Sequence, residues 1–113
     1  MGGMNQTDLV LDQLAGSAAE AAALLRALAN PPRLLVMCHL AAAEELAVGE
    51  LVERVGISQS ALSQHLAKLR EQGLVAYRRE GQVLRYHIAD PKVLHVLEVL
   101  HELYCPELGS ERT

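Results

Sequence analysis

The sequence contains no phenylalanine, no tryptophan and only three tyrosines among its 113 residues. Its hydrophobic core must therefore be built from leucine, valine and alanine, although half of all residues are hydrophobic. A chain this short forms one compact domain and buries only about two-thirds of the surface that it exposes when unfolded. We expect a single domain over residues 1–113, with flexible ends at 1–7 and 107–113, and burial of the surplus aliphatic side chains between two copies of the chain.

Long apolar runs are also absent, and no segment approaches the roughly 18 uninterrupted apolar residues that a membrane span requires. The first six residues, MGGMNQ, lack the basic start and the apolar stretch of a signal peptide. Cysteine is scarce: Cys38 and Cys105 lie far apart in the sequence and supply no disulfide framework. In a reducing cytosol, such cysteines are redox or metal-binding groups more often than structural disulfides. These absences predict a cytoplasmic protein without a membrane partner.

The net charge of −4 is unusual for a protein that binds nucleic acid. The charge is unevenly distributed, however, since residues 56–87 carry five basic and only two acidic side chains. A local excess of positive charge attracts the phosphates of nucleic acid even when the rest of the molecule is acidic. We therefore expect any contact with nucleic acid to come from this part of the chain.

Apolar periodicity and helix-breaking residues predict four helices, a β-hairpin and a final helix. The helices are expected over residues 8–28, 32–42, 48–55 and 58–72, the strands over 74–79 and 83–88, and the last helix over 91–105. Gly56 and Gly73 end the third and fourth helices, and Ser58 and Asp90 are the expected N-caps of the fourth and last. The predicted fold class is mainly α with a β-hairpin wing, in the order ααααββα, which is a winged helix-turn-helix.

The fourth predicted helix has the pattern of a DNA-reading helix. Leu62, Leu66 and Leu69 follow i, i+4 and i+7 spacing, which would anchor it to the core. Its other side carries hydroxyl and amide groups that can pair with base edges or phosphates, and its N-terminus attracts phosphate. The polar residues are Ser58, Gln59, Ser60, Ser63, Gln64 and Lys68. Taken alone, this face is equally typical of an ordinary solvated helix.

The hairpin that follows favours the DNA-binding interpretation. It carries Arg78, Arg79 and Arg85 beside its turn, and Gln82 within the turn. A basic hairpin next to a reading helix is typical of a wing that contacts phosphates or the minor groove. A winged helix that binds a protein partner through the same face is the alternative, and the salt dependence of binding would distinguish the two.

Two segments, ALANPPRLLVMCHL and ELAVGELVERVGISQSALSQHLAKLREQGLVAYRREGQVLRYHI, resemble the ArsR-type winged-helix repressors. The resemblance covers roughly residues 20–105 and implies a homodimer formed through the first and last helices. It also implies binding to double-stranded operator DNA of imperfect palindromic sequence, and release of that DNA when an inducer is sensed. The positions that the resemblance places against DNA are Gln59, Ser60, Ser63, Gln64 and His65, with Arg79 in the wing.

The metal sites common in that family are missing from this sequence. The third predicted helix has no Cys-x-Cys, and Asp90, His95 and His101 lack the spacing of interfacial zinc ligands. The positions of Cys38 and Cys105 are instead similar to those of the persulfide- and redox-sensing branch that includes BigR, SqrR and HlyU. That resemblance implies that reactive sulfur species bridge the two thiols, directly or through extra sulfur atoms, and thereby relieve repression.

Two other interpretations of the cysteines stay open. His101 and Cys105 share a helix face at i, i+4, and together with Cys38 and His39 they would offer a Cys/His metal site. Alternatively, each cysteine packs without any sensing role, since free cysteine is among the most buried residue types. The sequence has neither Cys-x-x-Cys nor a phosphate-binding loop, so it predicts no enzyme activity and no cofactor.

Overall fold

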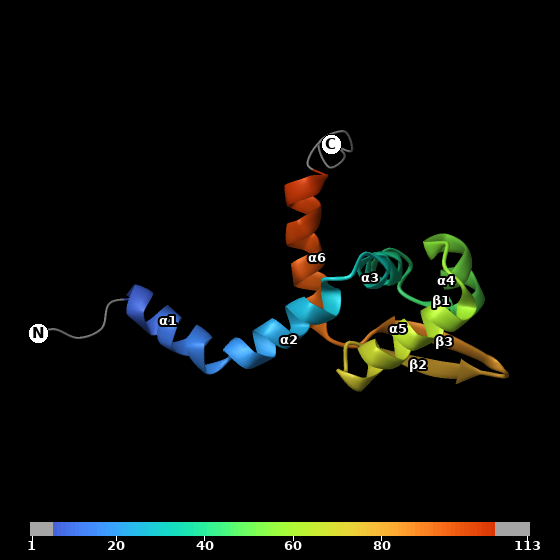
Figure 1. Cartoon of the computed structure of the whole chain (residues 1–113), viewed down its shortest axis with the longest axis horizontal. Coiled ribbons are helices and arrows are strands. Elements are labelled where there is room, and N and C mark those ends of the chain that lie inside the picture. The colour runs from blue at the N-terminus through green and yellow to red at the C-terminus, as the bar shows by residue number, and fades with distance from the viewer. Residues whose placement is uncertain (1–5, 106–113) are drawn as a thin grey trace, which may run out of the picture.

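The computed structural model describes residues 6–105, which form six helices and a three-stranded antiparallel sheet (Figure 1). The elements are α1 (Gln6–Gly16), α2 (Ala18–Leu28), α3 (Pro31–Ala43), β1 (Leu46–Ala47), α4 (Val48–Val55), α5 (Gln59–Glu71), β2 (Val75–Glu80), β3 (Val83–Ile88) and α6 (Pro91–Tyr104). The strand order is β1-β3-β2, so the short β1 extends the hairpin of β2 and β3. The predicted fold class, mainly α with a β-hairpin wing, is confirmed.

The predicted flexible ends fall largely outside the described residues, which exclude 1–5 and 106–113. Residues 6 and 7 belong to α1, which therefore begins two residues before the predicted start of the first helix.

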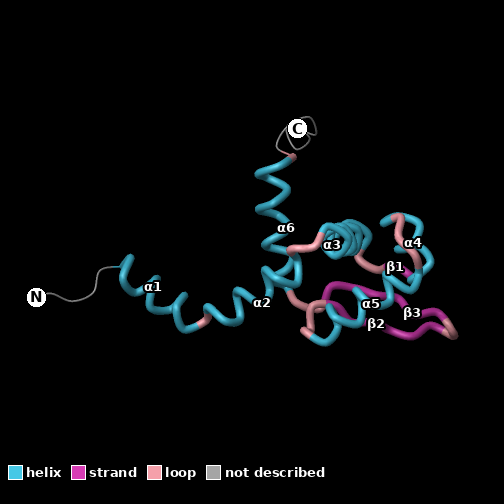
Figure 2. The backbone as a smooth tube through the Cα atoms, viewed as in Figure 1, coloured by secondary structure: helices cyan, strands magenta, loops and turns pink. Residues whose placement is uncertain are grey.

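The prediction of one continuous helix over residues 8–28 is wrong, because the structure divides this segment into α1 and α2. Ser17, between them, has φ −110° and ψ 11°, and its amide donates to the carbonyl of Leu14 over 3.0 Å instead of to residue 13. Gly16 weakens a helix at this point by about 1 kcal/mol relative to alanine. The apolar spacing continues across the break, so periodicity alone predicts a single helix. As a result, α1 and α2 meet at an angle (Figure 2).

Side-chain caps begin the two helices that flank the hairpin in the sequence. Ser58 Oγ accepts a hydrogen bond from the backbone N–H of Ala61 (3.1 Å) at the start of α5, and Asp90 Oδ1 accepts one from the backbone N–H of Lys92 (2.9 Å) at the start of α6. Gly56 ends α4 with a φ of 79°, a left-handed conformation that is easy for glycine. Both predicted N-caps and the predicted end of α4 are confirmed.

The core lies between α3, α4, α5 and the sheet, and the first turns of α6 pack against it. Leu62, Leu66 and Leu69 of α5 are buried, as their spacing predicts. The most deeply buried side chains are Val36, Met37, Leu40, Leu51, Leu62, Leu66, Leu69, Val75 and Val93. Among the described residues, Tyr86 is the one aromatic side chain in the core, which confirms the predicted aliphatic interior.

β1 is not predicted by the sequence, because two residues are too short to show an alternating pattern. Leu46 pairs with Tyr86 of β3 and is buried, while Ala47 pairs with Arg85. This pairing holds the loop after α3, including Glu45, beside the hairpin.

A cluster of aromatic and guanidinium groups fastens the hairpin to α5. Tyr77 and Tyr86 face each other across β2 and β3, with ring centroids 5.3 Å apart. Arg70, near the end of α5, donates from Nη1 to the hydroxyl of Tyr86 (3.0 Å), and its guanidinium lies 5.5 Å from the centroid of the Tyr77 ring. The reading helix and the wing therefore share one anchor.

α1 and α6 leave many apolar side chains uncovered, and both helices project from the body of the molecule (Figure 1). The exposed large hydrophobic residues on the N-terminal helices and on α6 are Leu9, Val10, Leu11, Leu14, Leu25, Leu94, Val99, Leu103 and Tyr104. Between Gln6 and Tyr104, no helix is both long and apolar enough to cross a membrane. Soluble proteins rarely expose this much apolar surface, and where they do, the surface marks a site of interaction with another molecule.

Removal of the Tyr86 hydroxyl tests the anchor between α5 and the wing. We expect Tyr86→Phe to lower the free energy of unfolding by about 1 kcal/mol, because the buried Tyr86 side chain loses its hydrogen bond with Arg70. Tyr77→Phe is the matched control, since the Tyr77 hydroxyl has no hydrogen bond within residues 6–105, and it should change stability by only a few tenths of a kcal/mol. Urea denaturation measures both variants, and equal losses would contradict the anchor.

Candidate DNA-binding face and thiol site

The helix-turn-helix consists of α4, a turn at residues 56–58 and α5, and the buried leucines decide which side of α5 faces solvent. The exposed α5 residues that the sequence predicts as DNA contacts are Gln59, Ser60, Ser63, Gln64 and Lys68. Ser58 is exposed as well, but its hydroxyl caps α5 and lies 3.4 Å from the hydroxyl of Ser60. The structure thus brings the predicted polar residues to the solvent side of α5, with all but Lys68 in its first half.

His65 occupies a different position from the other predicted contacts. It is half-buried, and its Nδ1 accepts a hydrogen bond from Nε of Arg33 on α3 over 3.1 Å. Burial lowers the pKa of His65, and the nearby positive charge of Arg33 lowers it further. His65 therefore lies at the edge of the exposed face, where α5 meets α3.

A groove of about 580 Å³ separates the start of α5 from the wing. Gln59 and Ser63 line it from α5, and Gln82 lines it from the hairpin turn. The backbone of Gly49, in the first turn of α4, closes one side. The groove brings the predicted contact Gln82 to the same cavity as two reading residues, which periodicity in the sequence does not reveal.

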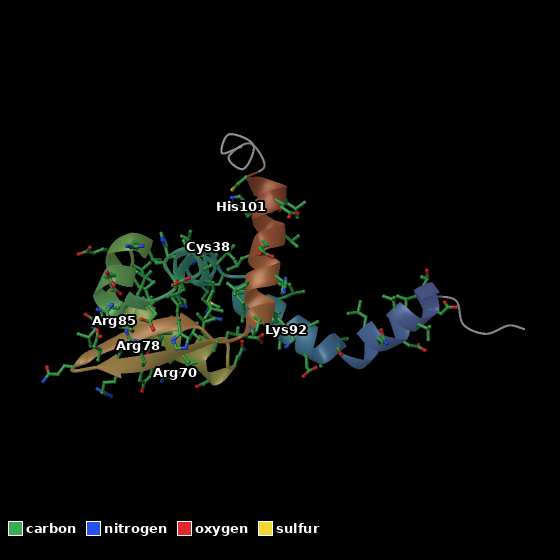
Figure 3. The ribbon with its side chains drawn as sticks, turned by 180° about the vertical axis from the view of Figure 1, so that it is seen from behind. Cys38, Arg70, Arg78, Arg85, Lys92 and His101 are labelled. Carbon is green, nitrogen blue, oxygen red and sulfur yellow. The ribbon has the colours of Figure 1, made fainter. Side chains whose placement is uncertain are left out.

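Two of the wing arginines are paired with carboxylates (Figure 3). Arg78 Nε donates to Glu45 Oε2 over 2.9 Å, and its Nη1 lies 3.6 Å from Glu80 Oε2. Arg85 Nε donates to Glu80 Oε1 over 2.7 Å, and its Nη1 lies 4.0 Å from Glu50 Oε1. The hydrogen bond from Arg78 lowers the pKa of Glu45, and the hydrogen bond from Arg85 lowers that of Glu80. Both carboxylates are therefore negatively charged at neutral pH, and they offset the positive charges of Arg78 and Arg85.

Arg79 differs from its neighbours in the wing. Side chains alternate along a strand, so Arg79 points to the opposite face of β2 from Arg78. In the part of the chain that the structure describes, no carboxylate lies within ion-pair distance of Arg79. Arg79 can reach a phosphate without giving up a partner, whereas Arg78 cannot. The sequence alone does not predict the pairing of Arg78 with Glu45, because 33 positions separate these residues.

The two cysteines lie on neighbouring helices that pack together. Cys38 is exposed in the middle of α3, and Cys105 is half-buried at the end of α6, where its N–H donates to the carbonyl of His101 over 2.7 Å. Both thiols are free. An open groove of about 380 Å³ between the helices is lined by Cys38, Leu97, Glu98 and His101, among others (Figure 3).

Cys105 acts electrostatically on Cys38. Partial burial raises the pKa of Cys38, and the negative charge of the Cys105 thiolate raises it further. The imidazoles of His39 and His101 do not offset this rise. The charge of Cys105 thus acts on Cys38 although the two residues lie far apart in the sequence.

The alternative metal site was expected from Cys38, His39, His101 and Cys105. Across residues 6–105, no group of three or more histidine, cysteine, aspartate or glutamate side chains is placed to hold a metal ion.

Comparison with known proteins identifies the family. Residues 30–77 match the sequence profile of the bacterial regulatory proteins of the arsR family. The HTH-type transcriptional regulator YgaV of Escherichia coli K12 is 43% identical over 96 residues, which span 85% of this chain and 97% of YgaV. This chain belongs to the ArsR family.

Other members of the family extend the similarity. The transcriptional activator HlyU of Vibrio cholerae is 47% identical over 95 residues, which cover 84% of this chain and 87% of HlyU. The crystal structure of the transcriptional repressor BigR from Xylella fastidiosa superimposes with a TM-score of 0.76 at 36% identity, over 90% of this chain and 98% of BigR. This ArsR-family chain is therefore a winged-helix transcriptional regulator of the HlyU and BigR type, and not an enzyme.

The different surroundings of Arg78 and Arg79 predict different effects on the salt dependence of DNA binding. We expect Arg79→Gln to reduce the slope of log affinity against log salt by about one unit per protomer, because an unpaired arginine that contacts phosphate displaces a counterion. Arg78→Gln removes the same charge but should change the slope little, since Glu45 already balances Arg78. Fluorescence anisotropy over a series of salt concentrations makes the measurement. Equal changes in slope would contradict the assignment.

The influence of Cys105 on Cys38 predicts a change in thiol reactivity. We expect Cys105→Ser to lower the pKa of Cys38, so that Cys38 is alkylated faster at a given neutral pH because more of it is thiolate. The rate with iodoacetamide, followed by mass spectrometry of the peptide that contains Cys38, measures the effect. His39→Gln is the control and should leave the rate unchanged. An unchanged or slower rate in Cys105→Ser would show that the two thiols do not interact.

Proposed function

We propose that this chain is a homodimeric, DNA-binding transcriptional repressor that releases its operator when a reactive sulfur species bridges Cys38 and Cys105. The observation that carries the proposal is the presence of two free thiols on neighbouring helices, where the charge of Cys105 helps to raise the pKa of Cys38. BigR is named a repressor and HlyU an activator, and we propose that this chain acts as BigR does.

The exposed α5 residues support DNA binding. Gln64, Ser60 and Ser63 offer amide and hydroxyl groups that pair with base edges or phosphates in a major groove. Lys68 and Arg79 supply positive charge on the helix and on the wing, and a groove lined by Gln59 and Ser63 of α5 and by Gln82 of the wing lies between the two elements. Because operator DNA is the partner, we propose the cytoplasm as the place of action.

The uncovered apolar side chains of α1 and α6 support a homodimer. A two-fold dimer presents two reading helices to half-sites about one helical turn of DNA apart, which matches a palindromic operator. The exposed fractions of 58% for Leu11 and 66% for Leu103 are large for leucine in a protein that acts alone.

The chemistry begins with a low-molecular-weight persulfide, R–S–SH. The Cys38 thiolate attacks the outer sulfur, the S–S bond of the persulfide breaks, RS⁻ leaves, and Cys38 becomes Cys38–S–SH. The Cys105 thiolate then attacks Sγ of Cys38, a Cys38–Cys105 disulfide forms, and HS⁻ leaves. The two thiols are oxidised, and the transferred sulfur is reduced to hydrosulfide. A second sulfur transfer before closure gives Cys38–S–S–SH, and attack on its middle sulfur leaves a trisulfide with HS⁻ again as the leaving group.

A covalent link between α3 and α6 would connect the thiols to the DNA-binding face through these two helices. α6 contributes to the proposed dimer surface, and α3 packs on the helix-turn-helix and is hydrogen-bonded to α5. A link that favours a different arrangement of these helices changes the separation of the two reading helices. A difference of 1–3 kcal/mol between the two arrangements, typical of allosteric coupling, lowers DNA affinity by roughly 5- to 150-fold.

The test combines intact mass with DNA binding. Reduced protein is treated anaerobically with glutathione persulfide, and aliquots are analysed by mass spectrometry and by anisotropy with operator DNA. We expect the mass of an intramolecular disulfide or trisulfide together with a loss of DNA affinity, and we expect neither change in Cys38→Ser or Cys105→Ser.

Each result that departs from this expectation has a definite meaning. A bridge without a change in DNA affinity identifies the cysteines as reactive but not regulatory. An unchanged mass identifies them as packing residues, and a loss of affinity that follows added metal ion instead of persulfide identifies a metal sensor. Gln64→Ala tests the reading helix independently of the thiols: we expect this variant to fold and to lose DNA binding.

A further inference from the structure

The hydrogen bond between α3 and α5 determines which nitrogen of His65 carries the proton. Nε of Arg33 donates to Nδ1 of His65 over 3.1 Å. A guanidinium is always protonated and has no acceptor, so the direction of this hydrogen bond is fixed. Nδ1 must therefore present its lone pair, and in a neutral ring the proton must be on Nε2.

The other ring nitrogen of His65 remains accessible. Within residues 6–105, Nε2 has no hydrogen-bond partner, and it is not among the polar atoms that the protein buries without one. Nε2 is the ring nitrogen farther from the backbone. Lys68 lies three positions later on α5, which makes it a neighbour of His65 on the helix surface, and it is exposed. The Nε2–H group can therefore donate a hydrogen bond to a phosphate oxygen, and Lys68 supplies positive charge on the same part of the helix surface.

We propose that Arg33 is a positioning residue for DNA binding, which holds His65 in its neutral Nε2–H tautomer and directs that N–H toward a DNA phosphate. The inference rests on the proposed function, because it takes α5 to be the DNA-binding helix. It adds Arg33, on the helix that carries Cys38, to the residues that determine DNA affinity.

The environment of His65 favours the neutral ring that this arrangement needs. Burial lowers the pKa of His65, and Arg33 lowers it further. A protonated ring carries an N–H on both nitrogens and would have to give up the hydrogen bond from Arg33. The ring is therefore neutral at pH 7, and the guanidinium selects the tautomer.

Two substitutions separate the hydrogen bond of Arg33 from its charge. In Arg33→Gln, the amide nitrogen stands at the same position along the side chain as Nε of arginine, so the donor is kept and the charge is lost. In Arg33→Lys, a methylene stands at that position and the ammonium lies one bond further out, so the charge is kept and the donor at the position of Nε is lost. Either variant is compared with the wild-type protein in circular dichroism to establish that it folds.

Nitrogen NMR of the histidine rings reads the tautomer directly in the DNA-free protein, at a pH above the ordinary imidazole pKa of about 6.5. We expect the Nε2–H tautomer for His65 in the wild-type protein and in Arg33→Gln, and a mixture of tautomers in Arg33→Lys. The other histidines, including His39 and His87, serve as internal controls and should keep their ring shifts in all three proteins.

DNA affinity should follow the tautomer and not the charge. We expect Arg33→Lys to weaken operator binding about tenfold, the effect of one lost hydrogen bond to a charged group, and Arg33→Gln to stay within about threefold of the wild type. Retention of the Nε2–H tautomer in Arg33→Lys would overturn the proposal, and so would a loss of affinity in Arg33→Gln alone. If the tautomer changes and affinity does not, His65 is no DNA contact, while Gln64→Ala still tests α5 as the reading helix.

Discussion

Leu62, Leu66 and Leu69 hold α5 on the core, and the rest of the candidate DNA-binding surface depends on this burial. Because the three leucines occupy i, i+4 and i+7, the helix can bury them only by turning residues such as Ser60 and Gln64 outward. Truncation of one such leucine to alanine costs about 2–5 kcal/mol, a large part of the stability of a small domain. The wing is then fixed relative to the same helix, since Arg70 of α5 contacts the tyrosine pair of β2 and β3. Reading helix and wing thus form one rigid unit.

α3 links this unit to the proposed sensor. Its buried side, with Val36, Met37 and Leu40, is part of the core, while Cys38 on its other side faces the groove shared with α6. Arg33, one and a half turns earlier on α3, is hydrogen-bonded to α5. A change in the position of α3 relative to α6 therefore has a short route to the DNA-binding face. The proposed mechanism requires no other moving element.

The sequence predicts most of the fold because local rules determine its helix ends. Ser58 and Asp90 as N-caps and Gly56 as the end of α4 act within a few residues, and the structure confirms all three. The break at Ser17 is missed because apolar spacing continues through it, and β1 is missed because two residues show no period. The site is less predictable, because its interactions join residues that are distant in the sequence. Arg78 pairs with Glu45, Arg33 pairs with His65, and Cys105 acts electrostatically on Cys38. Composition identifies such residues as candidates, but only the packing of the elements decides which are paired.

The central claim is that a covalent link between Cys38 and Cys105 is sufficient to lower DNA affinity. The most direct measurement is an operator titration of the bridged protein, purified away from persulfide and from unbridged chain, followed by a second titration of the same sample after chemical reduction. The account predicts weak binding before reduction and full recovery of affinity after it. Equal affinity in the two titrations would contradict it.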